Sequence, residues 1–404
     1  MRQKVFIIFL WALTLKYASL VIYCLVSIKL IMYFGLLINV GIVFFCLRFL
    51  KFRSPQRSIA ILYGLFIIGL TLWGVYNQNW VKFIISDIII WMMGIVVVIG
   101  SRDSNERLSR DLPKWVATWM IFGVPISWYL IFKYQISPAD FLLGQRFVYG
   151  GDWSGQSYGV FAPIQAIYAS VYVLPFFFEL KGIRRIAVLL GAGTILIFGL
   201  LTVSRQFIIV PLVGFGSIFF TRRKILGSDN FRYLGYLLFL CVFFVSIWAY
   251  VYGSATLSTT GYAVIERITN IEENRSDDLR IYWEAQSAVH KLVGRGMGGS
   301  NRTWIWEELP YGVAMLHYGF GHVLLKGGII FVLFIYSLTI FALYNLWRYS
   351  GEHCWFWVLI IFLITGFAHT EWGYFFPVIF FWLSISQAVN CSAKLRSSPI
   401  AVGL

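Results

Sequence analysis

Residues 253–316 read GSATLSTTGYAVIERITNIEENRSDDLRIYWEAQSAVHKLVGRGMGGSNRTWIWEELPYGVAML, and they form the only long polar stretch in an otherwise apolar chain of 404 residues. The chain is 59% hydrophobic and 13% charged, whereas charged residues make up about 25% of a typical soluble domain. An ionised group in hydrocarbon is costly, so a membrane protein gathers its charges where water or protein can solvate them. This composition indicates a membrane protein whose function is to be sought in or beside the polar stretch.

Apolar runs long enough to cross about 30 Å of hydrocarbon as helices recur along the whole chain. They predict an all-α, polytopic fold with about twelve membrane-spanning helices. The predicted spans are 5–27, 30–47, 58–75, 83–100, 115–132, 158–179, 186–203, 206–220, 232–252, 318–345, 355–370 and 372–388. The chain thus divides into residues 1–252 with nine spans, a large loop at 253–316, and residues 317–404 with three spans and a tail.

The formal charge of +15 is spread in short basic clusters between the apolar runs. Such spreading indicates membrane topology and gives no indication of nucleic acid as a partner. With the N-terminus inside, 20 of the 33 Lys and Arg residues fall on the inner side: Arg2/Lys4, Arg48/Lys51/Arg53/Arg57, Arg102/Arg107/Arg110/Lys114, Lys181/Arg184/Arg185, Arg222/Arg223/Lys224/Arg232, Arg348 and Lys394/Arg396. Both termini are therefore predicted inside and the large loop outside.

The large loop contains one predicted helix. Ser276 can cap its first turn, where Asp277 and Asp278 follow, and Gly294 should end it. An apolar stripe at helical spacing is expected to pack on the membrane domain; it consists of Ile281, Ala285, Ala288, Val289 and Leu292. Arg280 lies in the first turn, off the centre of that stripe.

Two arginines are candidates for binding phosphate, because the guanidinium group gives bidentate contacts to phosphate oxygens. Arg205 stands at the junction of two apolar runs, where the alternative is contact with lipid headgroups. Arg280 has Glu284 one turn away, so a plain surface ion pair is its alternative.

Two histidines and a glycine-rich run lie close to the next span. His317 opens that span and His322 follows, and either could transfer protons or, when charged, stabilise phosphate oxygens; a merely hydrogen-bonded histidine is the alternative. The run GRGMGGS at 294–300 lacks the Lys-Ser/Thr ending of a P-loop. We therefore expect a flexible turn there and no phosphate cradle.

Other charged positions receive no assigned role. Lys16 and Asp87 lie inside predicted spans, while His369 and Glu371 lie at the outer turn between the last two. The outer segment 133–157, which includes Arg146, is rich in glycine and aromatic residues, and it would suit either a loop over a site or a plain connector.

Three pieces of the chain resemble the O-antigen polymerase (Wzy) and O-antigen ligase (WaaL) superfamily of bacterial envelope glycosyltransferases. They are LTVSRQ at 201–206, RIYWEAQSAVHKLVGRGMGG at 280–299 and LHYGFGHVLLKGGI at 316–329. Arg205, Arg280 and His317 with Gly328 fit the family's positions. Tyr318 departs from the Asn or Ser that often follows the family's histidine.

The resemblance implies a GT-C-like, metal-independent and inverting glycosyltransferase of the bacterial inner membrane, with no cofactor and with its active site on the periplasmic side. Its donor would be an oligosaccharide on undecaprenyl diphosphate. It would be surrounded by membrane lipids, and a chain-length regulator is a candidate protein partner. Arg205, Arg280 and His317 would be catalytic by stabilising the diphosphate leaving group. The expected substrate contacts are Arg146, Arg267, Tyr318 and His322.

Three functions remain open at this stage. A surface-polysaccharide polymerase is the leading hypothesis, and an O-antigen ligase that transfers the glycan to lipid A core differs from it in the acceptor. A flippase or other secondary transporter is the third, and it would carry coupling charges near the middle of the membrane.

Overall fold

The computed structural model describes residues 57–99, 102–133, 167–201, 205–221, 274–300, 319–349, 353–368 and 375–397, with separate positions between 10 and 41. These residues are all-helical and contain no strand. The helices are α3 (Arg57–Tyr76), α4 (Val81–Ile99), α5 (Arg102–Lys133), α8 (Ser170–Val173), the 3-10 helix η1 (Leu174–Glu179), α9 (Ile183–Leu201), α10 (Arg205–Phe220), α13 (Asn274–Ala285), α14 (Ala288–Val293), α15 (Gly319–Tyr349), α16 (Cys354–Ala368) and α17 (Phe375–Ser397).

Most described helices cover predicted spans closely, but α5 begins at Arg102, 13 residues before the predicted span 115–132, and α17 continues to Ser397, nine residues beyond the predicted 372–388. Within the described residues, α3, α4, α5, α9, α10, α15, α16 and α17 lie over the spans that begin at 58, 83, 115, 186, 206, 318, 355 and 372. Among the described helices, two, Ser58–Tyr76 and Gly319–Arg348, are long and apolar enough to cross a membrane. The predicted spans 30–47 and 232–252, much of 5–27, and most of the large loop lie outside the described residues.

The predicted span 158–179 is wrong over its described end. Instead of one α-helix, residues 170–179 form the short helix α8 followed by the 3-10 helix η1, with Pro175 near the start of η1. Proline has no N–H to donate and its ring clashes within an α-helix, so the α-helical ladder stops there.

The contacts divide the chain into two compact units, Met1–Phe9, Asn39–Arg110 and Glu273–Leu404 in the first and Leu10–Ile38 and Asp111–Glu272 in the second. In the second unit α9 and α10 pack against each other, with α8 and η1 beside them. Gly199 permits this approach, because a Cβ there would lie 2.6 Å from the backbone of Phe207.

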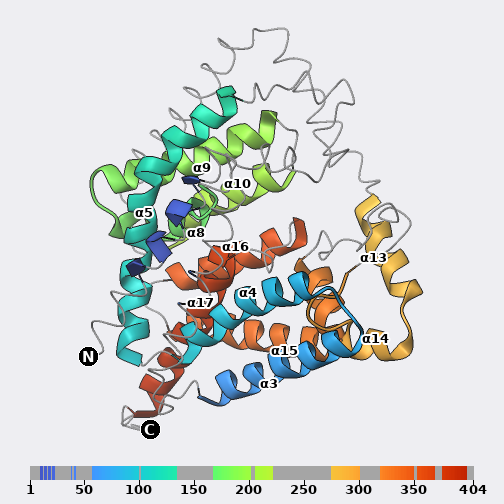
Figure 1. Ribbon diagram of the computed structural model, residues 1–404. Helices are drawn as coiled ribbons and strands as arrows, with labels where there is room; N and C mark the ends of the chain where they lie inside the picture. Colours follow the sequence, from blue (N-terminus) through green and yellow to red (C-terminus); the bar gives the residue numbers. More distant parts are fainter. Residues whose placement is uncertain are drawn as a thin grey trace. The chain divides into compact units, whose positions relative to one another are not determined.

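In the first unit α4 packs on α3 and α17, and α15 packs on α16, α17 and α14 (Figure 1). A buried aromatic cluster fills its centre. Tyr63 lies 4.3 Å from Trp382 and Trp91 lies 5.1 Å from Phe331 between ring centroids. The Tyr63 hydroxyl donates to the carbonyl of Trp91 at 3.1 Å, so α3 and α4 share a hydrogen bond within this cluster.

The helix predicted in the large loop consists of two helices. It begins at Asn274, before Ser276, and is interrupted after Ala285; Ser287 then accepts a hydrogen bond from the N–H of His290 and caps α14. The predicted end at Gly294 is confirmed, since this residue is the C-cap with φ of 69°.

The predicted packing stripe is wrong because the interruption at residues 286–287 changes the phase of the helix. Val289 and Leu292 are 53% and 52% exposed, while Tyr282 and Gln286, which share a face of the chain before the break, are buried. The helix pair therefore buries Tyr282 and Gln286, while Val289 and Leu292 of α14 face outward.

The helix α15 is interrupted at Gly328, where φ is 61° and ψ is −167°. An interruption leaves carbonyls on its N-terminal side without intrahelical donors. Those of Leu325 and Lys326 accept the backbone N–H groups of Arg295 and Gly296 at 2.8 and 2.9 Å. Residues 294–299, which we call the glycine loop, thus fill the hydrogen-bonding gap in a helix that is long enough to span a membrane.

The substitution Gly328→Ala tests this attachment. The positive φ and the nearby carbonyl of Leu292 leave no room for a side chain, so we expect a loss of at least about 1–3 kcal/mol in the free energy of unfolding. Thermal unfolding of the purified protein in detergent measures it. The matched control is Gly69→Ala in α3, where a Cβ meets nothing within 4 Å and should be neutral or slightly stabilising. Equal effects of the two substitutions would contradict the attachment.

Candidate functional site

Asp87 and Lys326 form a buried ion pair in the first unit. The Lys326 ammonium lies 2.7 Å from the Asp87 carboxylate, and the two side chains are 0% and 10% exposed. Asp87 belongs to α4 and Lys326 to α15, so the pair connects two helices that are distant in the sequence. A buried charge is tolerated only when it is paired and hydrogen-bonded, and here each charge has the other as its partner.

The glycine loop completes the surroundings of this pair. The N–H of Gly298 donates to the same carboxylate oxygen of Asp87 at 2.7 Å, and the Lys326 ammonium donates to the carbonyl of Gly299 at 2.8 Å. Both charges are therefore hydrogen-bonded to backbone of the loop as well as to each other. Loop, α4 and α15 form one connected polar cluster inside an apolar unit.

The glycine loop cannot act as a phosphate cradle in this conformation, because each of its backbone N–H groups already donates to protein oxygen. Those of residues 294 to 299 donate, in order, to the His290, Leu325, Lys326 and Leu70 carbonyls, the Asp87 carboxylate and the Gly296 carbonyl. A cradle needs several N–H groups that point at the anion. The interpretation that this run is not a P-loop agrees with the structure.

The expectation of a flexible turn at the glycine loop is wrong. Gly294, Gly296 and Gly298 have positive φ, and a Cβ on Gly298 would lie 2.5 Å from Ile84. The side chain of Asn79 donates to the carbonyls of Arg295 and Met297 at 2.8 and 2.9 Å. The glycines are thus required by close packing against α3 and α4, because only glycine adopts this backbone at so small a separation.

His322, a predicted substrate contact, is 1% exposed. It lies one turn before Lys326 on α15, and its ring centroid is 6.1 Å from that of Trp91. Neither of its ring nitrogens has a hydrogen-bond partner among the described residues. A side chain buried in this way offers no surface to a substrate that arrives from solvent, so the structure does not favour His322 as a substrate contact.

Arg280 lies on the exposed side of α13. Its guanidinium is 3.8 Å from the carboxylate of Glu284, and both side chains are 62% exposed. This geometry is the surface ion pair that the i,i+4 spacing suggested as an alternative. An exposed pair of this kind contributes only about 0.3–0.5 kcal/mol, so it does not prevent Arg280 from binding an anion.

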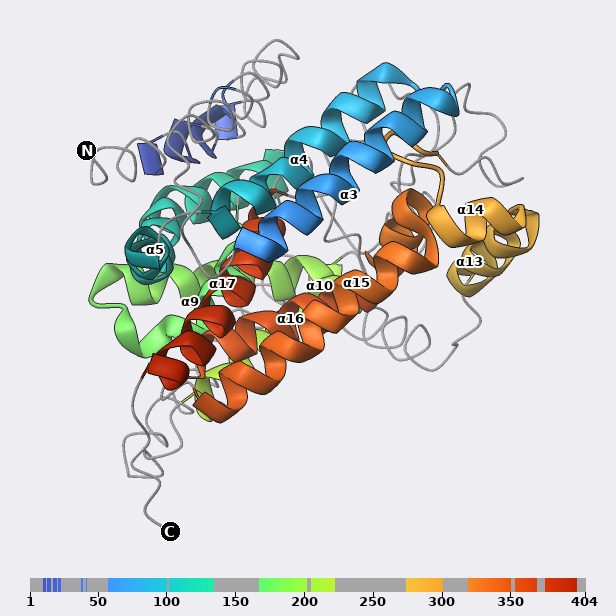
Figure 2. The same cartoon turned by 90° about the horizontal axis from the view of Figure 1, so that it is seen from below.

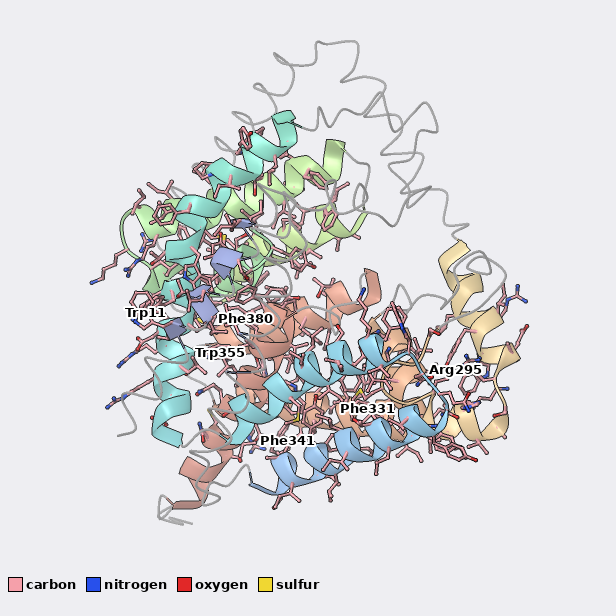
Figure 3. The ribbon with its side chains drawn as sticks, in the orientation of Figure 1. Trp11, Arg295, Phe331, Phe341, Trp355 and Phe380 are labelled. Carbon is pink, nitrogen blue, oxygen red and sulfur yellow. The ribbon has the colours of Figure 1, made fainter. Side chains whose placement is uncertain are left out.

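Arg295 occupies a more enclosed position that the sequence did not single out. Its side chain extends from the glycine loop and is half-buried (Figure 3), and Nε donates to Oε1 of Gln286, the residue after α13, at 2.9 Å. Nearby, burial raises the pKa of Tyr282, and the positive charge of Arg295 partly offsets this rise. Burial and the same charge both lower the pKa of His290.

Of the remaining predicted site residues, the structure describes only the backbone of Arg205. Arg205 is the first residue of α10, in the second unit, and its side chain is not among those described. Arg146, Arg267, His317 and Tyr318 lie outside the described residues, as do Lys16, His369 and Glu371. Gly319, the first residue of α15, follows His317 by two positions.

Among the described residues, no group of three or more His, Cys, Asp or Glu side chains is arranged to hold a metal ion. No family model, no curated protein and no solved structure matches the chain at a significant level. Over the described residues, the findings thus define an all-helical fold with two helices that could span a membrane.

The buried pair gives a direct test through combined substitutions. Lys326→Met leaves the Asp87 carboxylate buried without its counter-charge and is expected to lower the free energy of unfolding by about 3–5 kcal/mol. The double variant Asp87→Asn/Lys326→Met removes both charges while Asn can still accept from Gly298, so it should lose less than Lys326→Met alone. Thermal unfolding in detergent compares the two. A double variant less stable than the single one would contradict the pairing.

Proposed function

We propose that the chain is a polytopic inner-membrane glycosyltransferase that polymerises a surface polysaccharide from oligosaccharides on undecaprenyl diphosphate. The single observation that carries the proposal is the attachment of the helix pair α13–α14 to α15 through the glycine loop. This attachment joins the helix of Arg280 to the helix that begins directly after His317. Two of the three residues proposed for catalysis therefore belong to one unit.

The contacts agree with the topology that the basic clusters indicate. The glycine loop, proposed as periplasmic, is hydrogen-bonded to Asn79 in the turn between α3 and α4, and this turn falls on the same side. Ser109, within a cluster proposed as cytoplasmic, accepts a hydrogen bond at 2.9 Å from Gln387 near the cytoplasmic end of α17. Segments assigned to one side thus contact segments assigned to that side, as the twelve-span GT-C-like arrangement requires.

The proposed chemistry uses positive charge in place of a metal ion. A diphosphate leaving group gains negative charge in the transition state, and positioned guanidinium groups stabilise it. Leu325, where the loop attaches, lies six residues after Gly319, or about 9 Å along the helix. The outer end of α15 is therefore held close to the helix pair, which favours a shared site for Arg280 and His317. Arg205 belongs to the second unit, and its predicted role as a diphosphate ligand stays a prediction.

A secondary transporter is the second candidate, and the buried Asp87–Lys326 pair is the observation that favours it. Two features weigh against it. Asp87 lies six residues after Val81, about 9 Å into α4, whereas the middle of the hydrocarbon is about 15 Å deep. Each charge is also hydrogen-bonded to the backbone of the glycine loop, which disfavours exchange of the partner charge for an ion.

Polymerisation can be measured with purified protein and an undecaprenyl-diphosphate-linked repeat unit. We expect longer lipid-linked glycans, and a fall of about 100-fold in rate for Arg280→Ala with partial recovery in Arg280→Lys, because removal of a transition-state contact costs about 3 kcal/mol. Glu284→Gln is the matched control and should retain activity. Normal polymer length in both Arg280 variants would remove this residue from the mechanism.

Deletion of the gene separates the polymerase from the ligase. Single repeat units left on the lipid A core support the polymerase, whereas full-length chains left on undecaprenyl diphosphate would contradict it and support the ligase. Absence of any polymer product, combined with solute uptake into liposomes that contain the protein, would support the transporter.

A further inference from the structure

The two helices that are long enough to span a membrane indicate where its boundaries lie. Helix α3 has 20 residues from Arg57 to Tyr76, and α15 has about 20 residues between its interruption at Gly328 and its last arginine, Arg348. At about 1.5 Å per residue each stretch measures about 30 Å, which is the thickness of the hydrocarbon core. Since Arg57 and Arg348 mark one boundary, Tyr76 and Gly328 lie near the opposite one.

Helix α14 ends at this opposite boundary. The carbonyl of Gly294, its C-cap, accepts the indole N–H of Trp73 at 2.9 Å, and Trp73 lies about one turn before the end of α3. The carbonyl of Leu292 lies against Gly328, where it leaves no room for a Cβ. Figure 2, like Figure 1, shows α14 at the end of the bundle where α3 ends and α15 begins. Contacts with two different helices thus place α14 at the same level.

The outward-facing side of α14 is apolar. Val289 and Leu292 lie one turn apart on the helix, and each is just over half exposed. In α15, which packs on α14, no large apolar side chain within 319–328 is exposed, whereas Ile330 and Leu333 beyond the interruption are. Large apolar side chains on both helices are therefore exposed at the level where the hydrocarbon begins, and contact with lipid chains would remove them from water.

The polar side chains of α14 lie against aromatic rings. The His290 ring is 6.1 Å from that of Trp73, which stacks on the exposed Tyr76 at 5.3 Å between ring centroids. The Lys291 ammonium is 5.1 Å from the centre of the Trp283 ring. Trp and Tyr are enriched where membrane meets water, and a lysine there keeps its charge in water while its stem lies on apolar surface. This composition is typical of a helix at the level of lipid headgroups.

We propose that α14 is a membrane anchor, which lies at the boundary between lipid and water and inserts Val289 and Leu292 among the acyl chains of one leaflet. The bilayer is the partner that covers this apolar face, because the contacts with Trp73 and Gly328 hold the face at the edge of the hydrocarbon. The anchor goes beyond the proposed function, since it requires a bilayer and no glycan substrate. It would hold the helix pair α13–α14 at the membrane surface.

A photoreactive benzoylphenylalanine in place of Leu292 identifies what covers this face. The full-length protein is reconstituted into liposomes of phosphatidylethanolamine and phosphatidylglycerol, irradiated and analysed by mass spectrometry. We expect phospholipid adducts in a yield at least about fivefold above that from benzoylphenylalanine in place of Glu284, because an inserted side chain contacts acyl chains. Glu284 is the matched control, since it is 62% exposed and carries its charge on α13. Equal lipid yields at the two positions, or an adduct between two copies of the chain at position 292, would overturn the anchor.

A charge on the apolar face tests insertion separately. With benzoylphenylalanine in place of Val289, Leu292→Asp should lower the yield of lipid adduct at least about threefold, because a carboxylate is costly in hydrocarbon. The matched control is Ser287→Asp, at the exposed N-cap of α14, where aspartate also caps a helix; here the yield should change less than about twofold. Thermal unfolding in detergent checks that both variants are folded.

An unchanged yield in Leu292→Asp, or an equal fall in Ser287→Asp, would contradict insertion. No glycan donor enters either measurement, so the membrane anchor and the proposed function can fail separately.

Discussion

The buried contact between Asp87 and Lys326 is the constraint to which the rest of the first unit is fitted. Transfer of a carboxylate and an ammonium out of water costs several kcal/mol for each ion, and their attraction repays this cost only if the remaining hydrogen-bonding capacity is also satisfied. The glycine loop provides that capacity through the N–H of Gly298 and the carbonyl of Gly299. Once the loop is inside the unit, its own backbone must be satisfied there as well, and this requirement explains the interruption of α15.

The interruption and the loop depend on each other. Gly328 removes α15 from helical geometry and exposes carbonyls that need donors, while the loop carries N–H groups that need acceptors. The contact between Gly298 and Asp87 joins positions 211 residues apart. The glycine loop belongs to a polar stretch of the sequence, yet it packs inside the first unit. The helix pair α13–α14 is fixed to the unit through this loop.

Sequence patterns predicted the helices better than the site, for a physical reason. Long apolar runs determine a helix locally, so α3 and α15 were predicted within a few residues of their observed bounds. Gly294 was recognised because a glycine after a periodic segment is a local signal. The break at Ser287 was missed because a serine with alanine on both sides of the Gln-Ser pair gives little local indication of a stop.

The partner of Asp87 could not be found from the sequence, because pairing between helices depends on their arrangement in space. The sequence marks Asp87 as a charge within an apolar run. Lys326 stood only within the stretch 316–329 and was not recognised as its partner. Arg295 was missed for a similar reason, since its glycine neighbours suggested a flexible turn. One feature of the sequence could have indicated Arg295: it is the charged residue of the glycine-rich loop, and the segment before the loop carries Tyr282, which is buried.

Arg280 of α13 and Arg295 of the glycine loop differ in how their guanidinium groups are held. Arg295 is held by Gln286 and by the backbone carbonyl of Ser300, so its guanidinium has little conformational freedom. Arg280 is 62% exposed and shares its charge with Glu284, so a substrate must reorient it. A guanidinium stabilises a leaving diphosphate best when it is already in position, so the role proposed for Arg280 requires the bound substrate to draw it from Glu284 and to hold it in place before the bond breaks.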